Sequence, residues 1–96
     1  MLQVTEPAAG LLKRARNDLG APDTAGVRVQ SSRTDAGPRV HFVFREAPET
    51  GDETVEHFGL RFFVASDVAG VLTDAVLDVA TTAETSALTL RRARAL

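Results

Sequence analysis

The stretch GDETVEHFGLRFFV, residues 51–64, carries the clearest fold signal in the chain. Residues 54–58 and 60–64 can each form a strand, and Gly59 between them suits a tight hairpin turn. The preceding residues, 48–52, are of types that favour a turn. This part of the sequence therefore predicts two strands joined by a tight turn.

Upstream of this hairpin, the sequence predicts a short strand followed by a long helix. Residues 2–4 can form the strand, and Thr5 stands where a helix N-cap is expected. Gly20 and Pro22 are typical of a helix end. Apolar residues at helical spacing form one stripe, which comprises Ala8, Leu11, Leu12, Ala15 and Leu19.

From Gly26 the apolar period changes to two. Val27 and Val29 predict a short strand, whereas the polar residues 31–38 favour a loop. A further strand is expected from Arg39 to about Glu46. Its apolar face holds Val40, Phe42 and Phe44, and its other face holds Arg39, His41, Val43 and Arg45.

Downstream of the hairpin, a short helix and two more strands are expected. Ser66 can cap the helix, which would run through Leu72 with Val68, Val71 and Leu72 facing inward. Residues 75–80 and 87–90 are the last strand candidates. The order of elements indicates an α+β domain with mostly antiparallel strands, and the length of 96 residues predicts one domain, 1–96.

The composition excludes several classes of protein. A formal net charge of -2 gives no reason to expect nucleic acid or a membrane as partner. The chain has no cysteine and no visible signal peptide, so the cytoplasm is the expected location. No phosphate-binding glycine loop, dinucleotide fingerprint or nucleophile elbow is present, and we therefore expect no enzyme.

Residues 51–64, and residues 69–79 after them, resemble the central hairpin, short helix and next strand of the HesB/IscA-like (A-type) iron–sulfur biogenesis family. The helix after Thr5 and the strand at 26–29 match the element order of that family, so the resemblance covers nearly the whole chain. It implies a compact, barrel-like mixed or antiparallel sheet with one N-terminal helix and one short internal helix.

The resemblance does not extend to the cluster ligands. Members of the family bind iron or a cluster through three cysteines, one between the second and third strands and two near the C-terminus. The first position falls near Asp35 or Ala36, and the other two would fall in or beyond residues 90–96. Neither region contains cysteine, and iron in such clusters needs thiolate sulfur. The resemblance thus implies a cysteine-free divergent member that binds no cofactor, retained as a protein-interaction or accessory module.

Two alternatives stay open at this point. One is a metal-handling protein of the same fold, which would use His/Asp/Glu ligands or ligands from a partner. His41 and His57 are the only histidines, and if their strands were neighbours they could hold iron or zinc together with Glu56 or Asp35. Two half-exposed strand residues are the simpler interpretation, so no metal site is predicted. The other alternative is an unrelated small α+β domain.

The candidate partner-binding residues are Arg33, Asp35 and Arg39, around the predicted 31–38 loop. The arginines of this region could contact an acidic partner or a phosphate. A protein partner is expected, whose identity the sequence does not give, and homo-oligomerisation is also open. Other arginines could enlarge this basic surface or form a second one at the tail, namely Arg28, Arg45, Arg91, Arg92 and Arg94. The simpler interpretation of these charges is solubility and protection of strand edges. The phenylalanines are expected in the core, except that Phe58 or Phe63 could lie at an interface.

Overall fold

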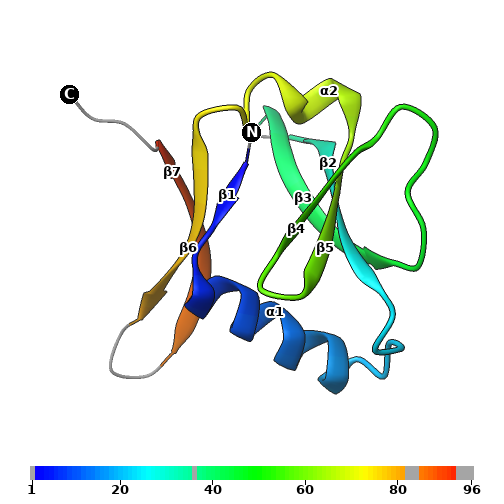
Figure 1. Cartoon of the computed structure of the whole chain (residues 1–96). Coiled ribbons are helices and arrows are strands. Elements are labelled where there is room, and N and C mark those ends of the chain that lie inside the picture. The colour runs from blue at the N-terminus through cyan, green and yellow to red at the C-terminus, as the bar shows by residue number, and fades with distance from the viewer. Residues whose placement is uncertain (1, 36, 82–84, 93–96) are drawn as a thin grey trace.

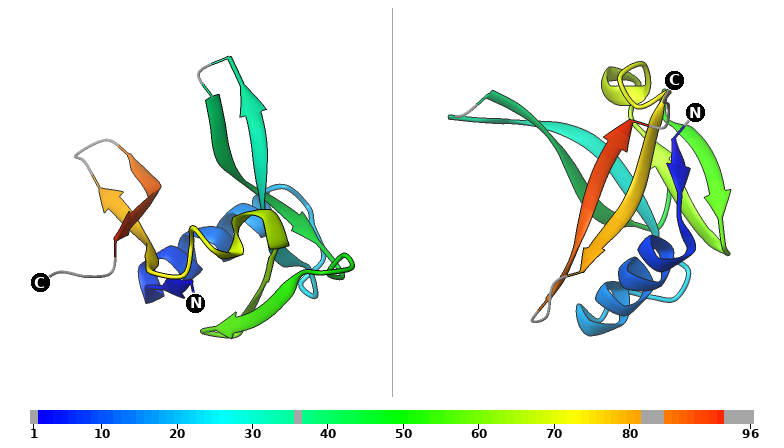
Figure 2. Two further views of the ribbon diagram at one scale, coloured as in Figure 1. Left: turned by 90° about the horizontal axis from the view of Figure 1, so that it is seen from above. Right: turned by 90° about the vertical axis from the view of Figure 1, so that its left-hand side faces the viewer.

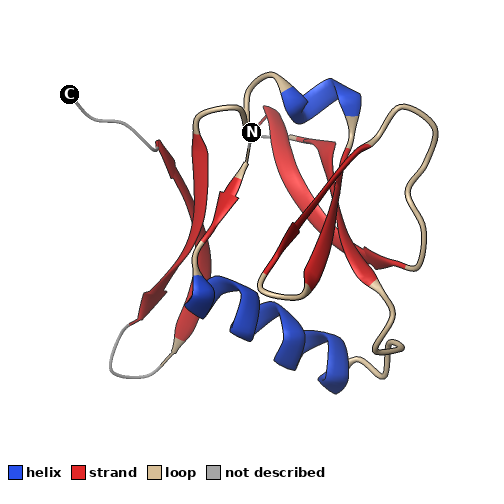
Figure 3. Ribbon diagram, viewed as in Figure 1, coloured by secondary structure: helices blue, strands red, loops and turns tan. Residues whose placement is uncertain are grey.

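The computed structural model describes residues 2–35, 37–81 and 85–92, which form seven strands and two helices (Figure 1). In chain order these are β1 (Gln3–Val4), α1 (Glu6–Asp18), β2 (Gly26–Thr34), β3 (Gly37–Arg45), β4 (Glu53–His57), β5 (Leu60–Val64), α2 (Ser66–Ala69), β6 (Ala75–Thr81) and β7 (Ser86–Arg92). The two helices lie at opposite ends of the strands (Figure 3). The α+β class and the hairpin at Gly59 are confirmed.

The strands form two sheets, ordered β1-β6-β7 and β3-β2-β5-β4. The pairs β2–β3, β4–β5 and β6–β7 are antiparallel, whereas β1–β6 and β2–β5 are parallel. The mixed sheet is therefore as expected, but the two sheets do not close into one barrel. On one side the ring Nε2 of His57 lies 3.1 Å from the carbonyl oxygen of Leu2, which links β4 to the start of β1. On the other side β3 and β7 are both edge strands (Figure 2).

Helix α1 begins as its sequence predicts. The side chain of Thr5 accepts a hydrogen bond from the backbone N–H of Ala8 at 3.3 Å, which satisfies one free amide of the first turn. Ala8, Ala9 and Leu12 are buried against the core. The inward position expected for Leu19 is wrong, because the helix ends at Asp18 and Leu19 lies in the exposed turn after it.

The predicted loop at 31–38 is also wrong. Strand β2 continues to Thr34 and β3 starts at Gly37, in continuous register from Gly26↔Arg45 to Thr34↔Gly37. This end of the hairpin projects away from the rest of the molecule (Figure 2). Residues that project into solvent need no apolar alternation, so their polar sequence resembles that of a loop. Gly37 has a φ of +108°, which a tight turn often requires and which glycine adopts without strain.

The core lies between the two sheets and α1. Strand β5 is buried on both faces of its sheet. Phe62 packs in the main core with Val27, Val29 and Leu77. Phe63 faces the opposite side of the sheet yet is fully buried. Phe63 therefore is not the exposed aromatic residue that the sequence left open; Phe58, at the tip of the β4–β5 hairpin, is 51% exposed.

Helix α2 is shorter than expected. It ends at Ala69, and its N-cap is Ala65, so Ser66 does not cap it. Val68 and Leu72 are buried as predicted. Val71 is exposed, because it lies past the helix end in a turn that points it away from the core. No helix within the described residues is long and apolar enough to cross a membrane.

Candidate functional site

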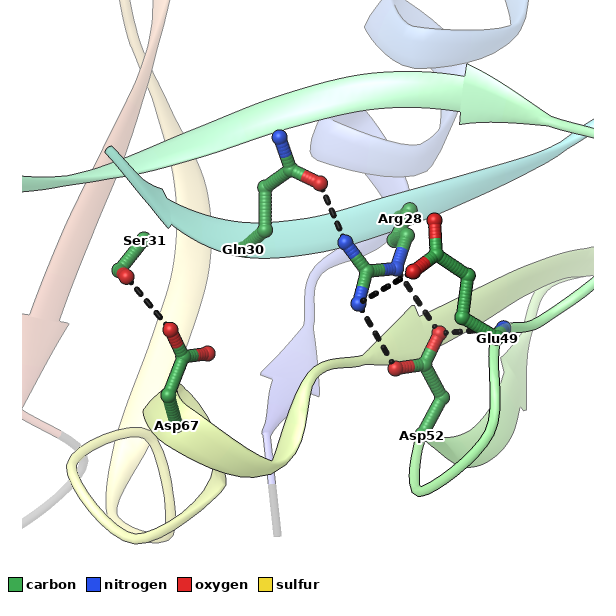
Figure 4. Close-up of polar contacts among 6 residues, drawn as sticks. All are labelled: Arg28, Gln30, Ser31, Glu49, Asp52 and Asp67. Carbon is green, nitrogen blue, oxygen red and sulfur yellow. Dashed lines mark hydrogen bonds and ion pairs between the residues drawn. The ribbon is translucent and has the colours of Figure 1, made fainter.

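A charged cluster fastens the segment before β4 onto β2 (Figure 4). The guanidinium of Arg28 donates from Nε to Asp52 Oδ2 at 2.9 Å and from Nη2 to Asp52 Oδ1 at 3.0 Å. The side chain of Asp52 is only 2% exposed, and it also accepts the backbone N–H of Glu49 at 2.9 Å. Arg28 Nη1 donates to Gln30 Oε1, and Glu49 Oε1 lies 3.6 Å from Arg28 Nη2. The guanidinium group of Arg28 is thus occupied by contacts within this cluster.

The same contacts set the charge states of the pair. The hydrogen bond from Arg28 holds the pKa of Asp52 below its ordinary value, although burial opposes this effect. The pKa of Arg28 is raised, chiefly by its hydrogen bond to Asp52. Asp52 is therefore occupied by this pairing, and Arg28 is not available for a basic docking surface.

The histidines lie apart. His41 is on β3 and His57 is on β4, which are the two outer strands of the four-stranded sheet. His41 is exposed, whereas His57 contacts Leu2 and packs edge-on against Phe62 with ring centroids 5.9 Å apart. The joint site that neighbouring strands would have allowed is therefore not formed, because β2 and β5 separate the two strands.

The weak carboxylate candidates are dispersed as well. Glu56 is an exposed residue of β4, opposite Arg61 on β5. Asp35 is exposed in the turn between β2 and β3. Across residues 2–35, 37–81 and 85–92, no three His, Asp or Glu side chains are grouped so that they could hold a metal ion.

The donor set also does not fit an iron–sulfur cluster. Asp35 occupies one of the two loop positions considered for a cysteine ligand, and Ala36 lies outside the described residues, as does Arg94 in the tail. The full sequence contains no cysteine, so no thiolate exists at either family position. Oxygen donors such as Asp35 are poor replacements for thiolate in this role.

An extended hollow surface lies between β3 and β7, each of which is an edge strand of its own sheet. Two hollows of about 530 and 440 Å³ meet at Val40 and Leu90, which line both. We call this surface the β3–β7 seam; it is formed by Arg39, Val40 and Phe42 of β3 together with Leu88, Thr89, Leu90 and Arg91 of β7. Leu72 and Leu77 lie beneath it.

The seam brings together residues that the sequence presented as two separate basic groups. By sequence alone, Arg39 belongs with the 31–38 region and Arg91 with the tail. In the structure both line one continuous groove whose inner residues are mainly aliphatic. Sequence patterns alone could not reveal this, because nothing in residues 39–42 or 88–91 specifies that β3 and β7 are edge strands that lie beside each other. The third candidate, Arg33, lies on β2 opposite Pro38 of β3, near the end of the hairpin.

Comparisons with solved structures identify proteins of the same fold. No family model and no curated protein matches the sequence. The crystal structure of IscA with the [2Fe–2S] cluster superposes with a TM-score of 0.83 at 18% identity, covering 96% of this chain and 85% of that one. SufA of Escherichia coli, involved in biosynthesis of iron–sulfur clusters, gives 0.72 at 22% identity, covering 99% and 82%.

A solution structure of a protein from Aquifex aeolicus gives a similar result, with a TM-score of 0.73 at 18% identity over 95% of this chain and 90% of that one. At such identities the likeness establishes architecture and not activity. The fold expected from the resemblance is thereby confirmed: this cysteine-free chain has the fold of IscA and SufA.

Proposed function

We propose that this chain is a cysteine-free protein-interaction or accessory module built on the IscA fold, and that it holds no iron–sulfur cluster with its own residues. One observation carries the proposal: a chain that shares its fold with a cluster-bearing IscA has no cysteine among its 96 residues. Without thiolate ligands, the chemistry that this fold supports in IscA has no donors here.

Binding, rather than catalysis, is the activity that the described surface supports. Enzyme sites usually gather titratable groups with perturbed pKa values in a concave pocket. Here the two hollows between β3 and β7 are lined mainly by aliphatic side chains. A polar hollow of about 460 Å³ contains Arg28 and Asp52, but these two side chains are paired with each other and fasten a loop. A cytoplasmic location belongs to the same proposal, because the chain has none of the disulfides on which small secreted domains rely.

The first half of the proposal is tested by metal content. The protein is purified anaerobically, incubated with ferrous iron, sulfide and a thiol reductant, desalted, and analysed for iron and zinc alongside its visible spectrum. Because the chain has no tryptophan or tyrosine, its own absorption is weak and any bound chromophore is easily seen. We expect a colourless protein with metal far below one equivalent. Near-stoichiometric iron with visible absorption would refute the proposal.

The second half is tested by binding. Proteins captured from a lysate of the source cells on the immobilised chain are identified, purified separately and titrated against it. A saturable one-to-one complex with at least one of them is the expected result. If no captured protein binds saturably in purified form, the interaction role is wrong even if the metal result stands.

A further inference from the structure

We propose that the β3–β7 seam is the docking groove for an extended segment of a partner protein in which apolar and acidic side chains alternate. This inference rests on the proposed interaction function and adds where the partner binds and what its chemistry is. Three features of the seam support it: free strand edges, an apolar inner wall and a basic outer rim.

The first feature is that β3 and β7 each have one free edge within the described part of the chain. β3 pairs with β2 on one side and β7 pairs with β6 on one side, and within the described part of the chain no strand pairs with the other side of either. An unpaired edge presents a row of backbone donors and acceptors that can bind an extended peptide as an added strand. With nine residues, β3 is long enough for such pairing.

The inner wall is apolar. Val40 and Phe42 point from β3 toward the core and are only partly buried, as is Leu88 on β7. Leu90 is 37% exposed. An added strand would point every second side chain toward these residues. Apolar residues at those positions would cover surface that the chain itself leaves open to water.

The outer rim is basic. Arg39 and Arg45 alternate with the apolar residues of β3 and are exposed on the opposite face. On β7, Arg91 alternates with Leu90; its side chain is 55% exposed even though it lies 3.3 Å from Asp78. The outward side chains of an added strand would lie beside these arginines, so acidic residues fit there. Asp74 lines one of the two hollows, which favours acidic residues beside Arg39 rather than at that end.

The chemistry of the edges also indicates why the occupant is another protein rather than a second copy. Positive charge on both edges opposes pairing of β3 or β7 with the same strand of another copy. β4 is the acidic edge strand, but its apolar residue Val55 already packs into the chain's own core. β1 has only two residues. No described edge of this chain therefore offers an unused alternating apolar and acidic face.

The test uses a defined probe. A labelled nine-residue peptide that alternates valine with glutamate is titrated against the intact chain by fluorescence anisotropy. Two control peptides have lysine in place of glutamate, or the same composition arranged as one valine block and one glutamate block. Backbone amide shifts and hydrogen exchange of the ¹⁵N-labelled protein locate the binding site.

Variants of the protein test whether the arginines of the basic rim contribute to peptide binding. We expect the alternating acidic peptide to bind, and Arg39→Glu to weaken it by on the order of tenfold. Arg91→Gln should weaken it less, because that residue is already paired with Asp78. Arg14→Glu makes the same charge change on an exposed residue of α1 and should leave the affinity unchanged. Thermal unfolding of each variant checks that exposed Arg39 can be changed without loss of the fold. New amide protection should fall on β3.

Several results would overturn the inference. The inference is wrong if the alternating peptide does not bind, or if the lysine or block peptide binds equally well. It is also wrong if Arg39→Glu leaves the affinity unaltered, or if the amide changes fall outside the seam. Self-association that protects the β3 amides without peptide would show that a second copy is the occupant, which also contradicts it. If the one-to-one partner complex persists in Arg39→Glu, the docking site is wrong while the interaction function stands. If iron binds stoichiometrically or no partner forms a complex, the function itself is wrong.

Discussion

Arg28 and Asp52, 24 residues apart, make a two-point contact in which both guanidinium-to-carboxylate distances are 3.0 Å or less. The contact joins the second strand to the turn that precedes β4, and the backbone N–H of Glu49 completes it. Two parallel charge-assisted hydrogen bonds fix orientation as well as distance. The long β3–β4 connection is thereby held on the sheet that it crosses.

Replacing Asp52 with asparagine should destabilise the fold. The change removes the main counter-charge of the largely buried Arg28 and leaves only the exposed Glu49 carboxylate at 3.6 Å, at a cost of roughly 1–3 kcal/mol. Urea unfolding followed by far-ultraviolet circular dichroism measures the free energy of unfolding. Glu53→Gln removes the same charge from an exposed neighbour and should change it by less than about 0.5 kcal/mol. Equal effects of the two variants would show that the contact contributes nothing specific.

The same carboxylate should make stability depend on pH. Folding lowers the pKa of Asp52 from its ordinary value of 3.8, so its contribution is fully present above that value. It is lost as pH falls through the lower pKa of the folded state. The difference in urea midpoint between wild type and Asp52→Asn should therefore be constant from pH 7 to about pH 5 and shrink below about pH 4. Asp78 has a lowered pKa as well, chiefly from the N–H of Val79, but it is common to both proteins and cancels. A difference that grows as pH falls would contradict this sign.

The parts of the fold that local chemistry specifies could be predicted from the sequence. Thr5 marks the start of α1, and Gly59 marks the turn of the β4–β5 hairpin, because caps and tight turns depend on a few adjacent residues. The end of the β2–β3 hairpin could not be predicted in this way. Its residues project into solvent, so neither an apolar period nor burial distinguishes a strand from a loop there.

The β3–β7 seam could not be predicted from local sequence, because it is formed by strands that are far apart in the chain. That Arg39 and Arg91 flank one groove follows from sheet order, including the parallel pairing of β2 with β5. The same order places His41 and His57 on opposite edges, which removes the metal hypothesis based on both histidines. No local pattern carries this information, because strand order is decided by the packing of the whole core.

Gly26 should tolerate no side chain. A Cβ atom there would lie 2.9 Å from Cε2 of the buried Phe63 ring and 2.8 Å from the backbone oxygen of Arg61. Backbone cannot yield as a flexible side chain can, so Gly26→Ala should cost roughly 1–3 kcal/mol. Gly10, within α1, has no atom within 4 Å of the corresponding position. Gly10→Ala should instead stabilise the protein by about 0.5–1 kcal/mol. Thermal and urea unfolding of both variants provide the comparison, and a neutral Gly26→Ala would show that β5 can move.

Phe58 carries the last prediction, which concerns strain at the β4–β5 turn. Its φ of 54° is unfavourable for a bulky residue, and the neighbouring Gly59 has a φ of 79°. Two successive residues with positive φ form the kind of turn for which asparagine followed by glycine is preferred. Phe58→Asn should therefore raise the free energy of unfolding by roughly 1 kcal/mol. The contact from Lys13 Nζ to the Phe58 carbonyl oxygen involves only backbone at position 58 and should persist.

Phe58→Ala is the matched control for this change. It removes the same exposed ring but keeps a residue that disfavours positive φ, so it should gain little or nothing. If alanine stabilises as much as asparagine, the benefit arises from loss of the half-exposed aromatic surface and not from relief of backbone strain. If both variants are less stable than the wild type, the ring makes contacts at the hairpin tip that outweigh the strained turn.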